Sequence, residues 1–174
     1  MIFIAGMFFI GPNQTLAASA SEINRNVDAA LKTLLAKSPS AKALSEKAKA
    51  ILVFPAITKG GFIVGGQYGE GALRKNHKTV GYYSTVAASY GLQIGIQRFG
   101  YALFFMSDSA LKWLDKSDGW EIGTGPSIVV VDVGAAGALT TTTAQSDIYA
   151  FFFSQKGLMA GLGLQGTKVT KIEK

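Results

Sequence analysis

The chain has 174 residues, of which 48% are hydrophobic and only 16% charged, so it is long enough for one domain with its own core. Seventeen Lys and Arg residues against eleven Asp and Glu residues give a net charge of +6, which favours an anionic surface such as lipid or nucleic acid as partner, or serves solubility alone. The absence of cysteine excludes disulfides, thiol catalysis, cysteine metal sites and lipid attachment through an N-terminal cysteine.

The first twenty residues have the pattern of an export signal. Residues 1–10 are almost wholly apolar, residues 11–14 break the run, and Ala18-Ser19-Ala20 fits a signal-peptidase site. Ten apolar residues are too few to span a bilayer, which takes about 20. No Lys or Arg precedes the run, so we expect the true start upstream. We predict a signal peptide over residues 1–20 and an exported, periplasmic or extracellular chain; a retained interfacial anchor is the alternative.

A helical region follows. The apolar residues of 21–37 recur at the spacing of an amphipathic helix, with polar residues on the other faces. Ser38 and Pro39 form a helix-start signal, with the serine as N-cap and the proline in the first turn. We predict a second helix from there as far as Ile51. Residues 22–59 include seven basic and three acidic residues, so this arm carries much of the excess charge.

After Pro55 the pattern becomes that of strands. Residues 82–97 alternate between an apolar face and a small or polar face, and this stretch is too long for one strand, so we expect a break near Gly91. Residues 98–106 are apolar on both faces, which predicts a central buried strand. The remaining predicted elements are a polar turn at 74–78, a helical insert at 107–116, and strands at 127–133 and 147–153. Residues 140–143 are predicted as a loop or strand edge, and residues 158–172 close the domain.

The order of these elements predicts the fold class. No linker interrupts residues 21–174, so we expect a single domain there. Helices followed by many strands favour the α+β class. Because glycine is frequent, we predict N-terminal helices packed on a strongly curved, largely antiparallel, glycine-rich, barrel-like sheet, with one helical insert near 107–116. Gly61, Gly65 and Gly69 lie on one strand face, which predicts a groove against another backbone and a loss of stability for Gly65→Val.

The sequence offers little for catalysis. His77 is the only histidine and lies in a lysine-rich turn, which supports neither a zinc site nor a Ser-His-Asp arrangement. Glu70 and Asp132 lie in apolar strand segments, and since no second carboxylate stands beside either, we interpret both as structural. Residues 60–71 lack the Gly-Lys-Ser/Thr ending of a phosphate-binding loop. We therefore predict no catalytic residues, no cofactor and no metal.

Two glycine-rich segments, residues 59–73 and 154–167, are the most informative part of the chain. Both are apolar stretches that glycine interrupts every two to four residues, which suits places where backbones approach closely or bend. With them the chain resembles the SYLF domain, a lipid-binding module, and above all its bacterial exported branch, from about Ser38 to Ile172. The matching motifs are Ala48-Lys49-Ala50 leading a strand, Gly61-Phe62 through Gly71, and Lys156-Gly157-Leu158-Met159-Ala160-Gly161.

The resemblance implies the fold above and phospholipid binding, and relatives also include yeast-type actin-binding SYLF proteins. Eukaryotic relatives bind lipid with an N-terminal amphipathic helix and basic residues, which the helix at 21–37 and the lysines match here. The chain departs from the family pattern at Met159, at Gln165 and at residues 134–137, where a basic contact is lost. Phosphoinositide selectivity is not carried over, and actin is a doubtful partner for an exported chain.

We therefore hypothesise a non-catalytic exported module that binds anionic phospholipid membranes and no nucleic acid. Lysines contribute about 1 kcal/mol each near a charged bilayer, and apolar side chains of the helix at 21–37 add buried area. The alternative is a cell-envelope structural or interaction module that self-associates or binds a protein through apolar surface. The candidate lipid-binding residues are Lys49, Lys59, Arg74, Lys75 and Lys156.

Overall fold

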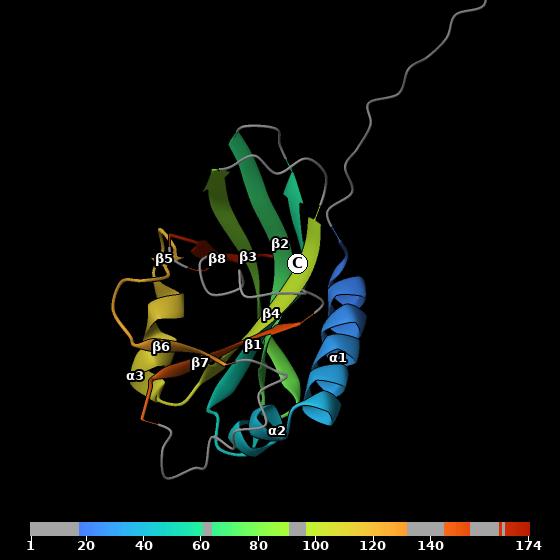
Figure 1. The fold of residues 1–174 in the computed structure, drawn as a ribbon, viewed down its shortest axis with the longest axis vertical. Coiled ribbons are helices and arrows are strands. Elements are labelled where there is room, and N and C mark those ends of the chain that lie inside the picture. Colours follow the sequence, from blue (N-terminus) through green and yellow to red (C-terminus); the bar gives the residue numbers. More distant parts are fainter. Residues whose placement is uncertain (1–17, 61–63, 91–96, 132–144, 154–163, 165) are drawn as a thin grey trace, which may run out of the picture.

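The computed structural model describes residues 18–60, 64–90, 97–131, 145–153, 164 and 166–174. Two helices precede the sheet, α1 (Ala20–Lys37) and α2 (Pro39–Ser45), and α3 (Asp108–Leu111) continues into a 3₁₀ turn, η1 (Lys112–Asp115). The strands are β1 (Ala50–Gly60), β2 (Val64–Lys75), β3 (Lys78–Tyr90), β4 (Gln97–Phe105), β5 (Trp120–Glu121), β6 (Ile128–Val131), β7 (Ile148–Phe153) and β8 (Lys168–Ile172) (Figure 1).

The two N-terminal helices begin at serine caps. The Ser19 hydroxyl accepts a hydrogen bond from the Glu22 amide over 3.2 Å, and the Ser38 hydroxyl accepts one from the Ala41 amide over 3.1 Å. The predicted helix-start signal at Ser38 is therefore confirmed. The predicted extent of the second helix is wrong, because α2 ends at Ser45 and Ile51 already lies in β1.

The eight strands of the described residues form one sheet, in the order β5-β8-β3-β2-β1-β4-β7-β6. The pairs are antiparallel except β6 with β7. β1 lies between β2 and β4, and its register shifts between Phe54 and Ile57 on the β4 side and between Val53 and Ile57 on the β2 side. Pro55 thus lies in a central strand, where a bulge removes the need for its missing N–H. The strand pattern begins at Ala50, before Pro55 and not after it.

The sheet curls strongly, as the glycine content predicts. The rings of Phe105 on β4 and Trp120 on β5 lie 6.1 Å apart, although four strands separate β4 from β5 in the sheet order. The hydroxyls of Thr85 on β3 and Tyr101 on β4 lie 2.7 Å apart across two intervening strands. The fold is therefore α+β with a curled, half-closed sheet (Figure 1).

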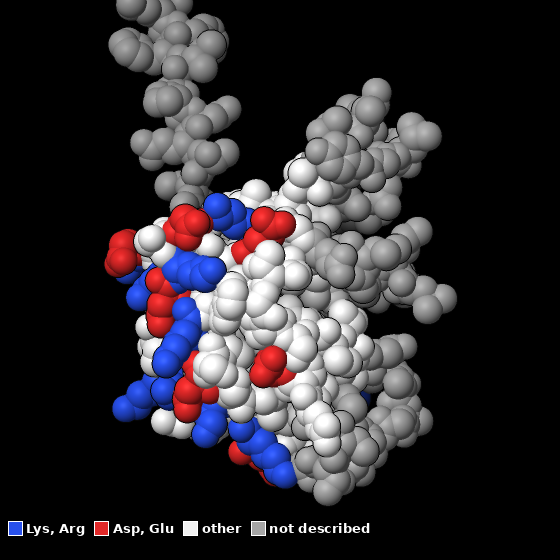
Figure 2. All heavy atoms as spheres, turned by 90° about the vertical axis from the view of Figure 1, so that its left-hand side faces the viewer, with Lys and Arg blue, Asp and Glu red and all other residues white. Residues whose placement is uncertain are grey.

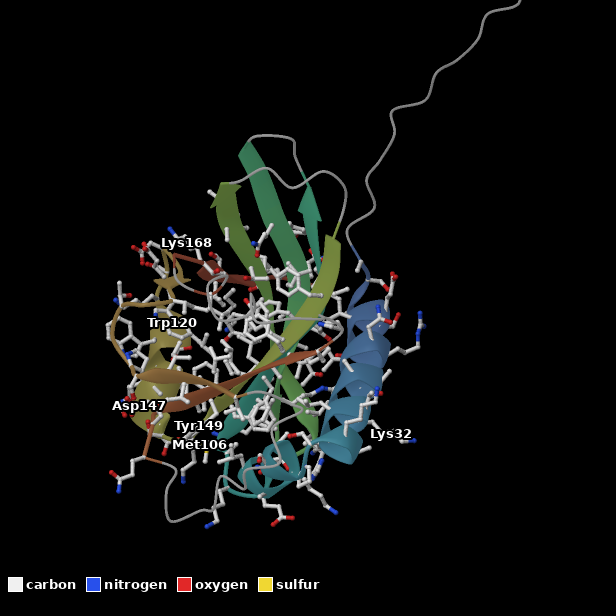
Figure 3. All side chains as sticks on the ribbon, in the orientation of Figure 1. Lys32, Met106, Trp120, Asp147, Tyr149 and Lys168 are labelled. Carbon is white, nitrogen blue, oxygen red and sulfur yellow. The ribbon has the colours of Figure 1, made fainter. Side chains whose placement is uncertain are left out.

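Each face of the sheet carries its own hydrophobic core. The inner core fills the curl of the sheet under α3 and η1, and Trp120 points into it (Figure 3). The outer core lies between the other face and the two N-terminal helices. Alternate residues of β1 divide between them: Leu52 and Phe54 belong to the inner core, Ile51 and Val53 to the outer core. A strand buried on both faces explains why residues 50–54 are continuously apolar.

Glycines of β2 lie against the β1 bulge. A β-carbon on Gly71 would overlap the Val53 carbonyl oxygen, and one on Gly69 would overlap the Ile57 side chain. This confirms the interpretation that glycine stands where backbones approach closely. Gly61 and the surroundings of Gly65 lie outside the described residues, so the effect of Gly65→Val stays a prediction.

The other predicted elements agree with the structure within the residues it describes. β4 is the central strand predicted at 98–106, between β1 and β7. The break expected near Gly91 lies outside the described residues. The helical insert is confirmed, with the Ser107 hydroxyl accepting from the Ala110 amide over 3.2 Å. Asp132 lies outside the described residues.

Candidate functional site

The apolar side of α1 faces the sheet. Ile23, Val27 and Leu34 are at most 2% exposed and belong to the outer core. Lys32, on the opposite side of the helix, points away from the sheet (Figure 3). The sequence-based assignment of these apolar side chains to a membrane is therefore corrected: in this fold they pack on β1 and β2, and the helix offers a membrane only its polar side.

Polar side chains fix α1 on the sheet near its middle. Arg74 of β2 forms an ion pair with Asp28 and donates to the Asn24 carbonyl oxygen over 3.2 Å. The Asn24 side chain accepts from the Thr79 hydroxyl over 2.8 Å and donates to the Tyr82 hydroxyl over 3.0 Å. We call these five residues the Asn24–Arg74 cluster. Arg74 is a predicted lipid-binding residue, but in the structure its guanidinium binds Asp28 and Asn24 of α1.

A second ion pair joins Lys174 to β2, close to the residues that precede α1. Lys174 lies 2.9 Å from a carboxylate oxygen of Glu70 and donates to the Ala18 carbonyl oxygen over 3.0 Å. The Tyr68 hydroxyl donates to the same carboxylate over 2.9 Å, and burial together with this acceptor raises the pKa of Tyr68. Since the Lys174 and Glu70 side chains are only 11% and 10% exposed, Glu70 has the structural role that its sequence context predicts.

Exposed lysines gather at the end of the molecule where α2 lies. They come from the α1–α2–β1 connection and from the β2–β3 turn, and both segments line one pocket, so they are adjacent. We call this surface the basic end. Figure 2 views another side, where acidic and basic residues interleave along one margin and basic residues gather toward the lower end. The basic end consists of the exposed Lys37, Lys42, Lys47, Lys49, Lys75 and Lys78.

A pocket of about 410 Å³ opens at the basic end, between the second half of α1 and the β2–β3 turn. Its apolar lining comes from α1 and the start of β1, and its charged lining contains acidic as well as basic groups. The full lining is Asp28, Leu31, Leu35, Ser45, Glu46, Ala48, Lys49, Ala50, Ile51, Arg74, Asn76 and His77. A lining of this kind suits a ligand with both charged and apolar parts.

The structure brings together three of the five residues predicted from the sequence. Lys49 and Arg74 line the pocket, and Lys75 is exposed at the adjoining turn. Lys59 lies at the other end of β1, where its backbone pairs with Gln67 and Gln97. Lys156 lies outside the described residues, as does the motif around it.

Sequence reasoning missed four lysines of the basic end and the acidic residue beside them. The signal was present, because residues 37–49 contain four lysines and one glutamate. It was read as excess charge on an arm, since only the sheet topology shows that this arm adjoins the turn at 76–77. The missed residues are Lys37, Lys42, Lys47, Lys78 and Glu46.

Within the described part of the chain, no group of three or more His, Asp or Glu side chains is arranged to hold a metal ion. None of the helices described is both long and apolar enough to cross a membrane.

Comparison with known proteins shows a family for this chain. The family model described as "Ysc84: Las17-binding protein actin regulator" matches residues 86–174, just over half of the chain. The match begins near the end of β3 and covers everything after it, whereas α1, α2 and the residues that line the pocket precede it. No curated protein matches the chain.

Proposed function

Because the chain belongs to the Ysc84 (SYLF) family, a family of binding domains, we propose that it is a non-catalytic, exported module that binds anionic phospholipid surfaces through its basic end. One observation carries the proposal. Six exposed lysines from two separate segments converge on this end, and Glu46 is the single acidic residue within those two segments, 37–49 and 75–78. Such a charge imbalance favours an anionic surface over a neutral one.

The energetics fit reversible binding. Each lysine near an anionic bilayer contributes about 1 kcal/mol, and salt weakens the contribution within a Debye length of about 10 Å. The apolar side of α1 adds nothing while it stays in the outer core. We therefore expect binding that depends on charge and disappears at high salt, with the helix docked.

Co-sedimentation with vesicles tests the proposal. The basic-end variant carries Lys42→Gln, Lys47→Gln and Lys75→Gln, and the charge-matched control carries Lys112→Gln, Lys168→Gln and Lys171→Gln, which are exposed on η1 and β8. We expect the wild type and the control to bind phosphatidylglycerol vesicles and not phosphatidylcholine vesicles. The basic-end variant should bind phosphatidylglycerol at least about tenfold more weakly. Equal binding to both lipids, or equal loss in both variants, would reject the proposal.

The description of the family names a protein partner, so a protein-binding role is the second candidate. Some apolar side chains support it, since Tyr68 and Val86 pair across β2 and β3 and are 51% and 49% exposed. Val129 and Val130 of β6 are 44% and 40% exposed. This role predicts self-association without lipid; light scattering that shows a monomer at all concentrations would count against it.

A further inference from the structure

The pocket at the basic end contains one cation and one anion that the fold leaves available. Asp28 and Arg74 are paired with each other. Lys49 and Glu46 are both exposed at the pocket, and among the described residues neither takes part in an ion pair. Asn76 and His77, from the β2–β3 turn, add exposed polar groups to the same rim. The free charges of the pocket thus balance, although the surface around it is strongly basic.

We propose that this pocket binds the phosphoethanolamine head group of a membrane phospholipid. Lys49 meets the phosphate, with Asn76 and His77 beside it, and Glu46 accepts hydrogen bonds from the ammonium group. The glycerol and the first methylene groups lie on the apolar lining formed by Leu31 and Leu35. This proposal rests on the proposed function, because the head group belongs to a lipid of the membrane that the basic end binds.

Charge and size together favour this head group over others. A purely anionic head group would meet Lys49 but would be repelled by Glu46, whereas a zwitterion pairs with both. A trimethylammonium group has no N–H to donate, so phosphocholine forgoes the hydrogen bonds to Glu46. The pocket volume of about 410 Å³ is within the range of sites for small ligands and exceeds what an inorganic ion needs.

The turn that carries Asn76 and His77 is narrowly defined. Lys75 pairs with Lys78, which leaves a two-residue hairpin loop, and both loop residues have positive φ, 49° for Asn76 and 62° for His77. Such a loop admits few conformations. The backbone of the turn therefore holds both residues at the rim of the pocket.

Soluble head groups test the pocket apart from the membrane. Backbone amide shifts around residues 46–49 and 76–77 are followed by NMR during titration with glycerophosphoethanolamine, glycerophosphocholine or glycerol 3-phosphate. We expect glycerophosphoethanolamine to bind most tightly. Glu46→Gln and Lys49→Gln should each weaken it by about fivefold, and Glu46→Gln should strengthen binding of glycerol 3-phosphate. Lys112→Gln, exposed on η1 and outside both the pocket lining and the basic end, should leave all three affinities unchanged.

Three results would overturn the proposal: no shifts with glycerophosphoethanolamine, equal affinity for glycerophosphocholine, or no effect of Glu46→Gln. A last experiment uses vesicles. Adding phosphatidylethanolamine to phosphatidylglycerol vesicles should raise the affinity of the wild type for the vesicles, but not that of Glu46→Gln. If only the soluble diester binds, the lipid assignment is wrong. These failures leave the proposed function standing, because binding to phosphatidylglycerol alone needs the lysines and not Glu46.

Discussion

Tyr101 places a hydroxyl in the inner core, 2.7 Å from the Thr85 hydroxyl. Burial raises the pKa of Tyr101, and the hydrogen bond with Thr85 opposes this only in part. The folded protein therefore keeps a proton that the unfolded chain gives up above about pH 10, so this tyrosine stabilises the fold below that pH and the contribution is lost as pH rises.

Tyr101→Phe tests this residue. At neutral pH the variant should be less stable by about 1 kcal/mol, because Thr85 loses its partner. Between about pH 9 and pH 11 the wild type should lose stability faster than the variant, so that the gap in melting temperature narrows. The test is to measure the melting temperatures of both proteins across this pH range. If the two melting temperatures fall in parallel as pH rises, Tyr101 does not lose a proton on unfolding.

His77 has a backbone conformation that L-residues adopt at a cost. The φ of His77 is 62°, and that of the preceding Asn76 is 49°. Two-residue hairpin loops with positive φ at both positions favour the sequence Asn-Gly. We expect His77→Gly to raise the free energy of unfolding by up to about 1 kcal/mol while weakening binding of glycerophosphoethanolamine. Chemical denaturation and the NMR titration measure the two effects. A less stable variant would show that the His77 side chain, and not its backbone, matters to the fold.

At the scale of elements, glycines of β2 allow β1 to bulge beside them. A β-carbon on Gly71 would overlap the backbone of Val53, whereas one on Gly66 would have nothing within 4 Å. Gly71→Ala should therefore lower the free energy of unfolding by about 1–3 kcal/mol. The matched control, Gly66→Ala in the same strand, should be neutral or slightly stabilising. Thermal melts compare the two, and equal effects would contradict the close approach.

α1 depends on the Asn24–Arg74 cluster for its place on the sheet. The Asp28 side chain is 67% exposed and the Arg74 side chain 12%, so solvent screens the pair in part. We expect Asp28→Asn to cost up to about 1 kcal/mol and to speed amide hydrogen exchange in α1. Lys32→Gln, on the exposed side of the helix, is the control and should change neither. Unchanged exchange in Asp28→Asn would show that the outer core alone holds the helix.

Local sequence patterns predicted most helices and strands. They failed where contacts between residues distant in sequence determine the secondary structure. The helical spacing of Ile23, Val27 and Leu34 predicted α1 within a residue of its start. The second helix was extended too far, because short apolar runs such as residues 50–54 fit a buried strand as well as a helix. Pairing with β2 and β4 makes this run a strand, and the sequence does not display that pairing.

The candidate site shows the same limit. Lys49 was identified by motif and does line the pocket, but Arg74 was predicted to be a free cation and instead binds α1. The pairing of Ile51 with Arg74 brings residues 46–49 beside the β2–β3 turn. Glu46 became a candidate only through that proximity, since in sequence it is one charge on a lysine-rich arm.

At the scale of the whole molecule, a sheet with a hydrophobic core on each face carries a strongly basic surface at one end. Both faces of the sheet are covered, the apolar side of α1 is occupied, and the lysines of two segments meet beside a pocket. A membrane would then contact the protein at this end, with the side formed by η1 and β8 turned away from it.

Site-specific fluorescence tests this orientation most directly. The chain has no cysteine, so one introduced cysteine carries one environment-sensitive dye. Ala36→Cys labels the last turn of α1 beside Lys37, and Ser117→Cys labels the connection between η1 and β5; both positions are exposed. With phosphatidylglycerol vesicles we predict a blue shift of the dye at residue 36, none at residue 117, and no shift at either with phosphatidylcholine. Equal shifts at both positions, or a shift at residue 117 alone, would contradict binding through the basic end.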